Sequence, residues 1–242
     1  MNKVLVIARV IVRSNLGYCW RLLDRCLTTP RNDGMIFVLL SMLLISSCLT
    51  STPQAPPQVV SAYSSSSAQP WLSDLYDCAE KPSVAIRLVD SPSGADIYLK
   101  VGEPKYLTSF AYQIDQEEIL IVTHRQSPVQ NLTVEQVQNL FAGFGDPSVQ
   151  VWVYASGDEI FEVFDQFVMK GRSVSSSAMV AVNPQQMSDV LNNESNAVGI
   201  LPLHWKAGDV REVYSVAKVP VLAITQTEPQ GVINQLVGCL QK

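Results

Sequence analysis

An apolar run of thirteen residues, from Met35 to Ser47, stops at Cys48 and divides the chain into two parts of different character. The run is shorter than the roughly 20 apolar residues that a membrane-spanning helix needs. Its length, and the small residues just before the cysteine, fit the apolar core of a secretory signal. A short membrane anchor and a buried helix are the alternative interpretations. On the signal interpretation, only the residues after the run are available to form a globular fold.

The stretch Ile45-Ser-Ser-Cys48 resembles the bacterial lipoprotein signal, in which a cysteine after a small residue is lipidated and becomes the new N-terminus. The resemblance implies a lipid at Cys48 and a location on the extracytoplasmic face of a bacterial cell membrane. Residues 1–47 are then a signal segment with a long basic start, unless translation begins near Met35. Residues 48–69 carry no charge and are rich in Ser, Thr, Pro and Gln. This composition predicts a flexible tether.

The charge balance changes once the signal segment is set aside. Residues 48–242 carry 11 basic and 20 acidic side chains, a net charge of −9. Binding to nucleic acid favours a basic stripe, so this acidic balance argues against a nucleic-acid partner. It leaves room for a local basic pocket that binds a small anion.

The cysteines fall into three groups. Cys19 and Cys26 lie in the signal segment, Cys48 takes the lipid, and Cys78 and Cys239 remain. A remaining pair in an oxidising compartment predicts a disulfide, which here would join the first and last predicted helices. Two buried free thiols are the alternative.

Apolar periodicity predicts alternating strands and helices over the rest of the chain. The run at residues 118–123 is almost continuously apolar and predicts a buried strand. Thr133 and Gln136 form a capping-box pattern at the start of a helix. The alternation predicts an α/β fold with a mostly parallel sheet. Strands are expected at residues 84–89, 95–101, 118–123, 149–154, 179–182, 197–201, 213–216 and 220–225, and helices at 71–78, 133–141, 159–169, 184–191 and 229–240.

Five motifs in order resemble the type 2 periplasmic binding proteins, in the branch that holds the phosphate-binding proteins of ABC importers. The closest match is Asn131-Leu-Thr-Val-Glu-Gln-Val-Gln-Asn-Leu-Phe-Ala-Gly143. The others are Gly94-Ala-Asp-Ile-Tyr98, Glu117-Glu-Ile-Leu-Ile-Val-Thr-His124 with the following Gln126-Ser-Pro-Val129, Ser156-Gly-Asp158, and Asn196-Ala-Val-Gly-Ile-Leu-Pro202.

The resemblance implies two α/β lobes with a ligand in the cleft between them. The first lobe would comprise residues 70–121 and 200–242, and the second residues 122–199. Two hinge strands, at residues 118–123 and 197–201, would cross between the lobes. Helix N-termini at the cleft would bind an oxyanion through backbone N–H groups and hydroxyls.

The chain departs from this family at two positions. The family has a Gly/Ser-rich anion-binding turn and a helix between its first two strands, whereas residues 89–95 join the strands predicted here almost directly. The first lobe is therefore expected to be reduced. At the second turn, Asp158 stands where a threonine-type donor is expected, and its charge repels an anion.

Hydroxyls and one guanidinium near the predicted cleft are the candidate ligand-binding groups. Each also has an ordinary interpretation, as a loop serine, a cap residue or a solvated arginine. The candidates are Ser91, Ser93, Thr108, Ser109, Arg125, Ser156, Gly157 and Ser176.

Catalytic and metal chemistry find little support in the sequence. Neither of the two histidines has cysteines or carboxylates at metal-ligand spacing, and no cofactor motif occurs. The stretch Ser215-Val-Ala-Lys218 matches an S-x-x-K motif but lies between predicted strands, without the partner motifs. The sequence therefore predicts no enzyme. It predicts a solute-binding lipoprotein that captures a small polar, anionic ligand, phosphate-like among others, for an ABC permease. A reduced, non-transporting member of the fold, acting as a sensor or envelope lipoprotein, is the alternative.

Overall fold

The computed structural model describes residues 58–104, 106 and 109–242. These belong to the folded unit Pro56–Lys242. The predicted signal segment, Cys48 and Thr108 lie outside the described residues. Within the described part of the chain, no helix has the length and apolar character needed to cross a membrane.

One mixed sheet of eight strands, in the order β2-β1-β3-β8-β4-β7-β5-β6, runs through the unit. The strands are β1 (Val59–Ser64), β2 (Ala85–Leu88), β3 (Ile97–Val101), β4 (Phe110–His124), β5 (Gln150–Tyr154), β6 (Met179–Ala181), β7 (Ala197–Pro202) and β8 (Val210–Thr225). The α/β fold class is confirmed, and the sheet is mixed, with the long central ladders antiparallel. The strand pairs β1–β2, β1–β3, β5–β6 and β5–β7 are parallel, whereas β3–β8, β4–β8 and β4–β7 are antiparallel.

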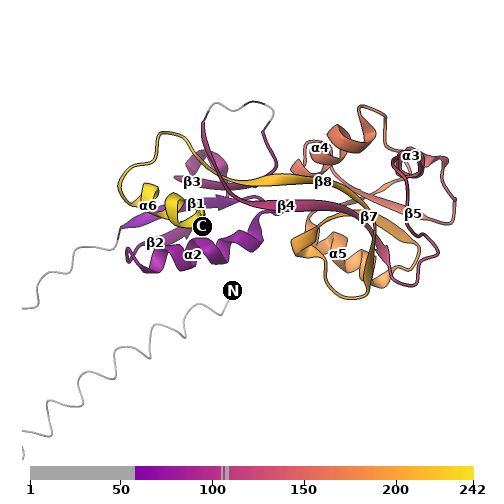
Figure 1. Cartoon of the computed structure of the whole chain (residues 1–242), viewed down its shortest axis with the longest axis horizontal. Coiled ribbons are helices and arrows are strands. Elements are labelled where there is room, and N and C mark those ends of the chain that lie inside the picture. The colour runs from indigo at the N-terminus through magenta and orange to yellow at the C-terminus, as the bar shows by residue number, and fades with distance from the viewer. Residues whose placement is uncertain (1–57, 105, 107–108) are drawn as a thin grey trace, which may run out of the picture. The chain divides into compact units, whose positions relative to one another are not determined.

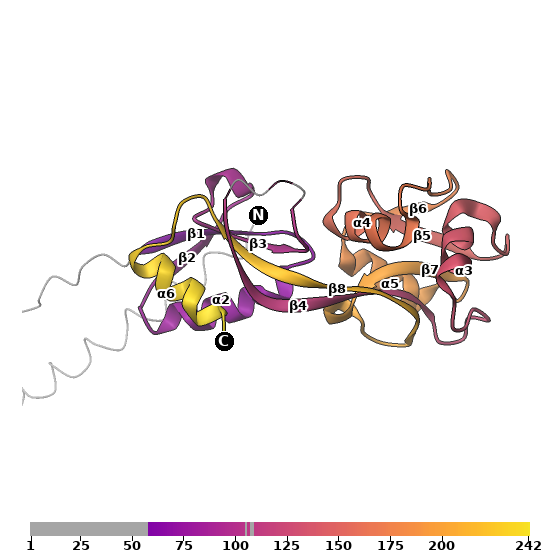
Figure 2. The same ribbon diagram turned by 45° about the horizontal axis from the view of Figure 1, so that its top comes forward.

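Two lobes lie at the ends of the long antiparallel pair β4 and β8, which runs from one lobe to the other (Figures 1 and 2). The first lobe contains β1–β3 with the helices α2 (Leu72–Glu80) and α6 (Gly231–Leu240). The second lobe contains β5–β7 with α3 (Val134–Asn139), α4 (Glu159–Phe164) and α5 (Pro184–Asn193). Short helical turns complete the chain: η4 (Gln69–Trp71), η5 (Pro92–Gly94), η6 (Leu140–Phe144), η7 (Asp165–Met169) and η8 (Leu203–Trp205).

The predicted second hinge strand is wrong. Residues 197–201 fall in β7, which pairs with β4 and β5, and the return crossing is made by β8. The two strands expected at residues 213–216 and 220–225 are parts of β8, which continues through Pro220 although a residue without a backbone donor seldom lies inside a strand. Here β3 pairs with β8 only from Val221 onward, so Pro220 lies just beyond that ladder.

The predicted tether is wrong from residue 59 onward. Residues 59–64 form β1, which lies between β2 and β3 in the sheet. The strand was missed because small residues fill its buried positions, among them Ala62 and the polar Ser61. Asp96 satisfies Ser61 by accepting from its backbone N–H at 2.8 Å and from its hydroxyl at 2.6 Å.

A disulfide between Cys78 and Cys239 joins α2 to α6, with the two Cα atoms 5.8 Å apart. The predicted pairing is confirmed. The predicted buried strand is also confirmed, because the four residues from Ile119 to Val122 have no exposed surface. Consecutive side chains of a strand point to opposite faces, so β4 is covered on both sides at this point.

Candidate functional site

A cleft of about 940 Å³ lies where the two lobes face each other beside the crossing strands. The first lobe contributes the end of β3 and the segment that follows it, from Lys100 to Pro104 together with Tyr106. The second lobe contributes residues between Ser156 and Phe167, including the first turns of α4. Strand β8 forms the remaining wall with Lys218, Val219 and Pro220. A cavity of this size is typical of a small-molecule site.

Two of the candidate residues from the sequence lie in this cleft. Ser156 and Gly157 form the exposed turn that leads from β5 to α4, and both line the cavity. Gly157 has a φ of +93°, a conformation that suits glycine in a tight turn. Asp158 begins α4 as a cap, since its carboxylate accepts the N–H of Ile160 at 2.8 Å.

The other described candidates lie elsewhere. Ser91 and Ser93 bond to each other on η5, with their hydroxyls 2.9 Å apart. Arg125 is exposed at the end of β4 in the second lobe, where its backbone N–H donates to Asp209. Ser109 and the exposed Ser176 do not line the cleft.

A Ser-rich turn that the sequence analysis placed in the tether lies at the edge of the first lobe. Ser65 to Ser67 follow β1, which ends at Ser64, and lead into η4 and α2. The position is the one where the resemblance calls for a Gly/Ser-rich turn between the first strand and a helix. The prediction that this turn is missing is therefore wrong, because the strand before it was not recognised. Four consecutive serines after the Val-Val-Ser-Ala-Tyr strand are the signal that could have found it.

Glu159 links the Ser-rich turn to the second lobe. The Ser65 hydroxyl donates to one Glu159 oxygen at 2.5 Å, and the Lys100 ammonium donates to the other at 3.1 Å. The Glu159 side chain is 7% exposed and that of Lys100 is 15% exposed. Burial raises the pKa of Glu159, while Lys100 and the Ser65 hydroxyl oppose that rise. Burial also raises the pKa of Tyr98, and the negative charge of the nearby Glu159 adds to that rise. Sequence reasoning missed all three members of this contact.

Among the described residues that line the cleft, acidic side chains outnumber basic ones. Its cations are Lys100, which is paired with Glu159, and Lys218, whose ammonium lies 3.8 Å from Glu118. Its acidic residues are Glu103, Glu159, Glu162 and Asp165. Both lysines are thus already near a carboxylate, and an anion entering the cleft has to compete for them. Nowhere in the described residues do three or more potential metal ligands gather into a metal-binding group.

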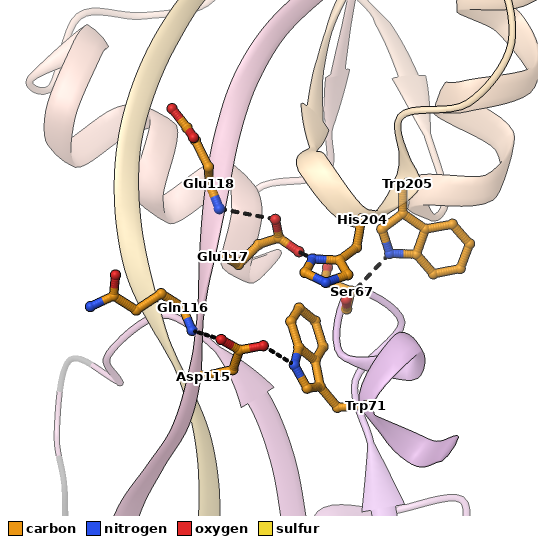
Figure 3. A network of polar contacts seen from close by, with 8 residues as sticks. All are labelled: Ser67, Trp71, Asp115, Gln116, Glu117, Glu118, His204 and Trp205. Atoms are coloured by element: carbon orange, nitrogen blue, oxygen red, sulfur yellow. Dashed lines mark hydrogen bonds and ion pairs between the residues drawn. The ribbon is translucent and has the colours of Figure 1, made fainter. Parts of the chain in front are cut away.

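A second contact between the lobes involves the turn η8, which follows β7 (Figure 3). His204 in this turn bonds to Glu117 on β4, and its ring lies 4.5 Å from that of Trp71 in the first lobe. The indole N–H of Trp205 donates to the backbone oxygen of Ser67 at 3.3 Å. The indole N–H of Trp71 donates to Asp115 on β4 at 2.9 Å. These bonds hold η8 against both the first lobe and the crossing strand.

Solved structures share this architecture. A phosphate ABC transporter substrate-binding protein from Clostridium perfringens, with bound phosphate, matches with a TM-score of 0.69 at 16% identity, over 76% of this chain and 93% of that one. A phosphate transport receptor from Vibrio cholerae matches with a TM-score of 0.56 at 16% identity, over the same shares. The Synechocystis CcmR regulatory domain in complex with 2-PG matches with a TM-score of 0.61 at 8% identity, over 76% and 96%.

These neighbours define the fold as that of the type 2 periplasmic binding proteins, as the motifs predicted. They are binding proteins and regulatory domains rather than enzymes. No protein-family model matches the sequence, and a search of curated proteins finds no relative.

Proposed function

We propose that this chain is an extracytoplasmic, lipid-anchored binding protein that captures a small polar ligand in the cleft between its lobes and delivers it to an ABC importer. The observation that carries the proposal is the cleft itself, because it is lined by residues of both lobes and of a strand that joins them. In such an arrangement a ligand contacts both lobes at once and favours their closure. The likeness to two phosphate-transport proteins supports this choice.

The ligand is proposed to be anionic. Ser65, Lys100 and Ser156 supply hydroxyl and ammonium donors at or beside the cleft. Hydrogen bonds from a charged donor to an oxyanion are among the stronger ones in proteins. The acidic residues of the lining then act as a filter, since each of them repels an anion that does not reach these donors.

Ligand binding is tested by thermal unfolding of the purified full chain with phosphate, sulfate, molybdate and small carboxylates. At least one ligand should raise the melting temperature in a saturable manner, because a ligand at 100 times its Kd stabilises the folded state by about 2.7 kcal/mol. Ser156→Trp should abolish the shift by filling the cleft. Ser176→Trp, on an exposed residue away from the cleft, is the matched control and should keep it. No shift with any ligand would contradict the proposal.

The lipid anchor is tested separately, by labelling cells that express the full chain with radioactive palmitate. Wild type should incorporate label and partition with membranes, and Cys48→Ser should do neither. Cys26→Ser is the control, since this cysteine precedes the proposed cleavage point, and it should be labelled as wild type is. Equal labelling of wild type and Cys48→Ser would overturn the anchor.

A sensor or structural envelope protein is the second candidate, and one observation favours it. The side chain of Glu159 already occupies the Ser65 and Lys100 donors, as expected of a binding protein that has lost its ligand. The regulatory domain complexed with 2-PG shows that a fold of this kind also serves outside transport. If wild type binds none of the ligands tested while remaining membrane-anchored, this second candidate is favoured over the first.

A further inference from the structure

The Glu159 carboxylate makes contacts in the cleft that a bound anion would make. Each of its two oxygens accepts from a different donor of the opposite lobe, the Ser65 hydroxyl at 2.5 Å and the Lys100 ammonium at 3.1 Å. The side chain is almost fully buried although it lines an open cavity. It therefore lies at the wall of the cavity, packed against the donors of the first lobe.

A phosphate or carboxylate ligand would accept hydrogen bonds from the same two donors, the Ser65 hydroxyl and the Lys100 ammonium. Both kinds of ligand present negatively charged oxygens that accept from hydroxyl and ammonium groups. The Ser65 hydroxyl can donate only one hydrogen bond, and it donates that bond to Glu159. Lys100 lines the cavity but its side chain is only 15% exposed, so an anion that reaches its ammonium lies beside the Glu159 carboxylate, which repels it. The two anions therefore exclude each other at this position.

We propose that Glu159 is a built-in competitor for anionic ligands, and that an oxyanion binds at Ser65 and Lys100 only by displacing the Glu159 carboxylate. This inference rests on the proposed function, because it concerns the same cleft. On this proposal, Glu159 sets the minimum strength of contact that an anionic ligand needs in order to bind in the cleft. A ligand that only replaces the two bonds of Glu159 gains little, so selection falls on ligands that make additional contacts in the cavity.

Competition also couples binding to the position of the lobes. Glu159 belongs to α4 in the second lobe, and both of its partners belong to the first lobe. While the carboxylate stays in place it bridges the lobes without a ligand. An entering oxyanion that replaces it takes over this bridge, provided that it also contacts the second lobe.

The test is the response of Glu159 variants of the full chain to phosphate and acetate, each compared with chloride at equal ionic strength. Glu159→Ala removes the carboxylate and should lower the melting temperature, because Lys100 then lacks its buried partner. Added phosphate or acetate should restore the lost stability. The affinity for the rescuing anion should exceed that of wild type by at least about tenfold, since an internal competitor has been removed.

Two further variants keep the test decisive. Glu159→Gln has nearly the same shape and removes only the charge, so it provides the same comparison if the alanine variant does not fold. Glu103→Ala removes another acidic residue of the cleft lining, one that is exposed, and measures the effect of charge alone. It should raise the affinity far less. Lys100→Gln added to Glu159→Ala should abolish the rescue.

The outcomes separate this inference from the proposed function. The competitor role of Glu159 is overturned if its variants respond to anions no more than Glu103→Ala does, or if the rescue persists without Lys100. If wild type binds no ligand but acetate rescues the Glu159→Ala chain, the importer function is contradicted and the competitor role of Glu159 stands. Wild type that binds well, beside unresponsive Glu159 variants, would keep the binding function and reject the competitor.

Discussion

The imidazole Nδ1 of His204 lies 2.8 Å from the Oε2 atom of Glu117, whose side chain is completely buried. The other carboxylate oxygen accepts the backbone N–H of Glu118 at 2.9 Å. Burial raises the pKa of Glu117, and the contact with His204 opposes that rise. Because Glu117 lies on the crossing strand β4 and His204 on η8, this pair attaches the end of β7 to the strand that joins the lobes (Figure 3).

Replacing His204 should therefore destabilise the fold. In His204→Ala the buried carboxylate loses the imidazole and keeps only its bonds to backbone groups, those of Glu118 and of residue 204. We expect the free energy of unfolding to fall by about 2 kcal/mol, the usual cost of leaving a buried polar group without its partner. Guanidinium denaturation of the full chain measures the change.

The control for this prediction is a double-mutant cycle with Glu117→Gln. Without the negative charge, His204→Ala should cost clearly less than it does in wild type, because no buried charge loses its partner. Equal costs in both backgrounds would show that His204 acts through its packing on Trp71 and not through the carboxylate.

The stability should depend on pH through Glu159. Its pKa in the folded chain is raised from 4.5, so its favourable contribution is complete below about that pH and is lost as the pH rises through the folded pKa. The free energy of unfolding of wild type, relative to Glu159→Gln, should thus fall as the pH is raised from acid toward neutrality. Denaturant midpoints measured at several pH values test this.

Glu135 provides a control of opposite sign. Hydrogen bonds from its own backbone N–H and from Thr133 lower its pKa, so its contribution is present above pH 4.5 and is lost as the pH falls. Wild type should gain stability relative to Glu135→Gln as the pH rises. If both variants show the same slope, the burial of Glu159 is not the cause of its pH dependence.

The sequence predicted the parts of this fold that depend on simple residue patterns and do not require knowledge of distant contacts. The strand around Ile119–Val122 carries an unbroken apolar run, the capping box at Thr133 forms with both of its hydrogen bonds, and simple counting paired Cys78 with Cys239. Strand β1 was missed because its buried Ser61 depends on Asp96, 35 residues away.

The site was harder to predict for the same reason. Ser156 and Gly157 were found because a turn before a helix has a local signature. The contact of Glu159 with Lys100 spans 59 residues, and that with Ser65 spans 94. An acidic residue in the first turn of a helix has an ordinary explanation as a favourable charge. Only the packing of the two lobes shows that its carboxylate faces a lysine and a serine of the other lobe.

Removal of the disulfide between Cys78 and Cys239 should weaken the first lobe. The bond joins residues 161 positions apart and attaches the last helix to the first one. The variant Cys78→Ser with Cys239→Ser should lose about 3 kcal/mol in the free energy of unfolding, within the usual range for a native disulfide. Guanidinium denaturation with and without a reducing agent measures this. Reduction should shift wild type and leave the double variant unchanged, and any equal effect on both would have another origin.

A side chain at Gly102 should destabilise the fold, because two constraints meet at this residue. Its φ is +79°, and a Cβ atom added there would lie 3.2 Å from a methyl carbon of Val163 in the opposite lobe. The left-handed conformation alone costs a residue with a side chain roughly 1–2 kcal/mol. Gly102→Ala should thus lower the free energy of unfolding by at least about 1 kcal/mol. Gly94→Ala, with open space around it, should change it by less than about 0.5 kcal/mol.

The same glycine reports on the approach of the two lobes. In a Val163→Ala background the methyl contact is removed while the backbone strain stays, so the cost of Gly102→Ala should decrease but not disappear. A cost that is unchanged by Val163→Ala would mean that the β3 end and α4 are farther apart in solution than in this structure. The contact of Lys100 with Glu159 joins the same two segments, so it would then be open as well, and the Glu159→Ala chain would show no loss of stability for an anion to restore.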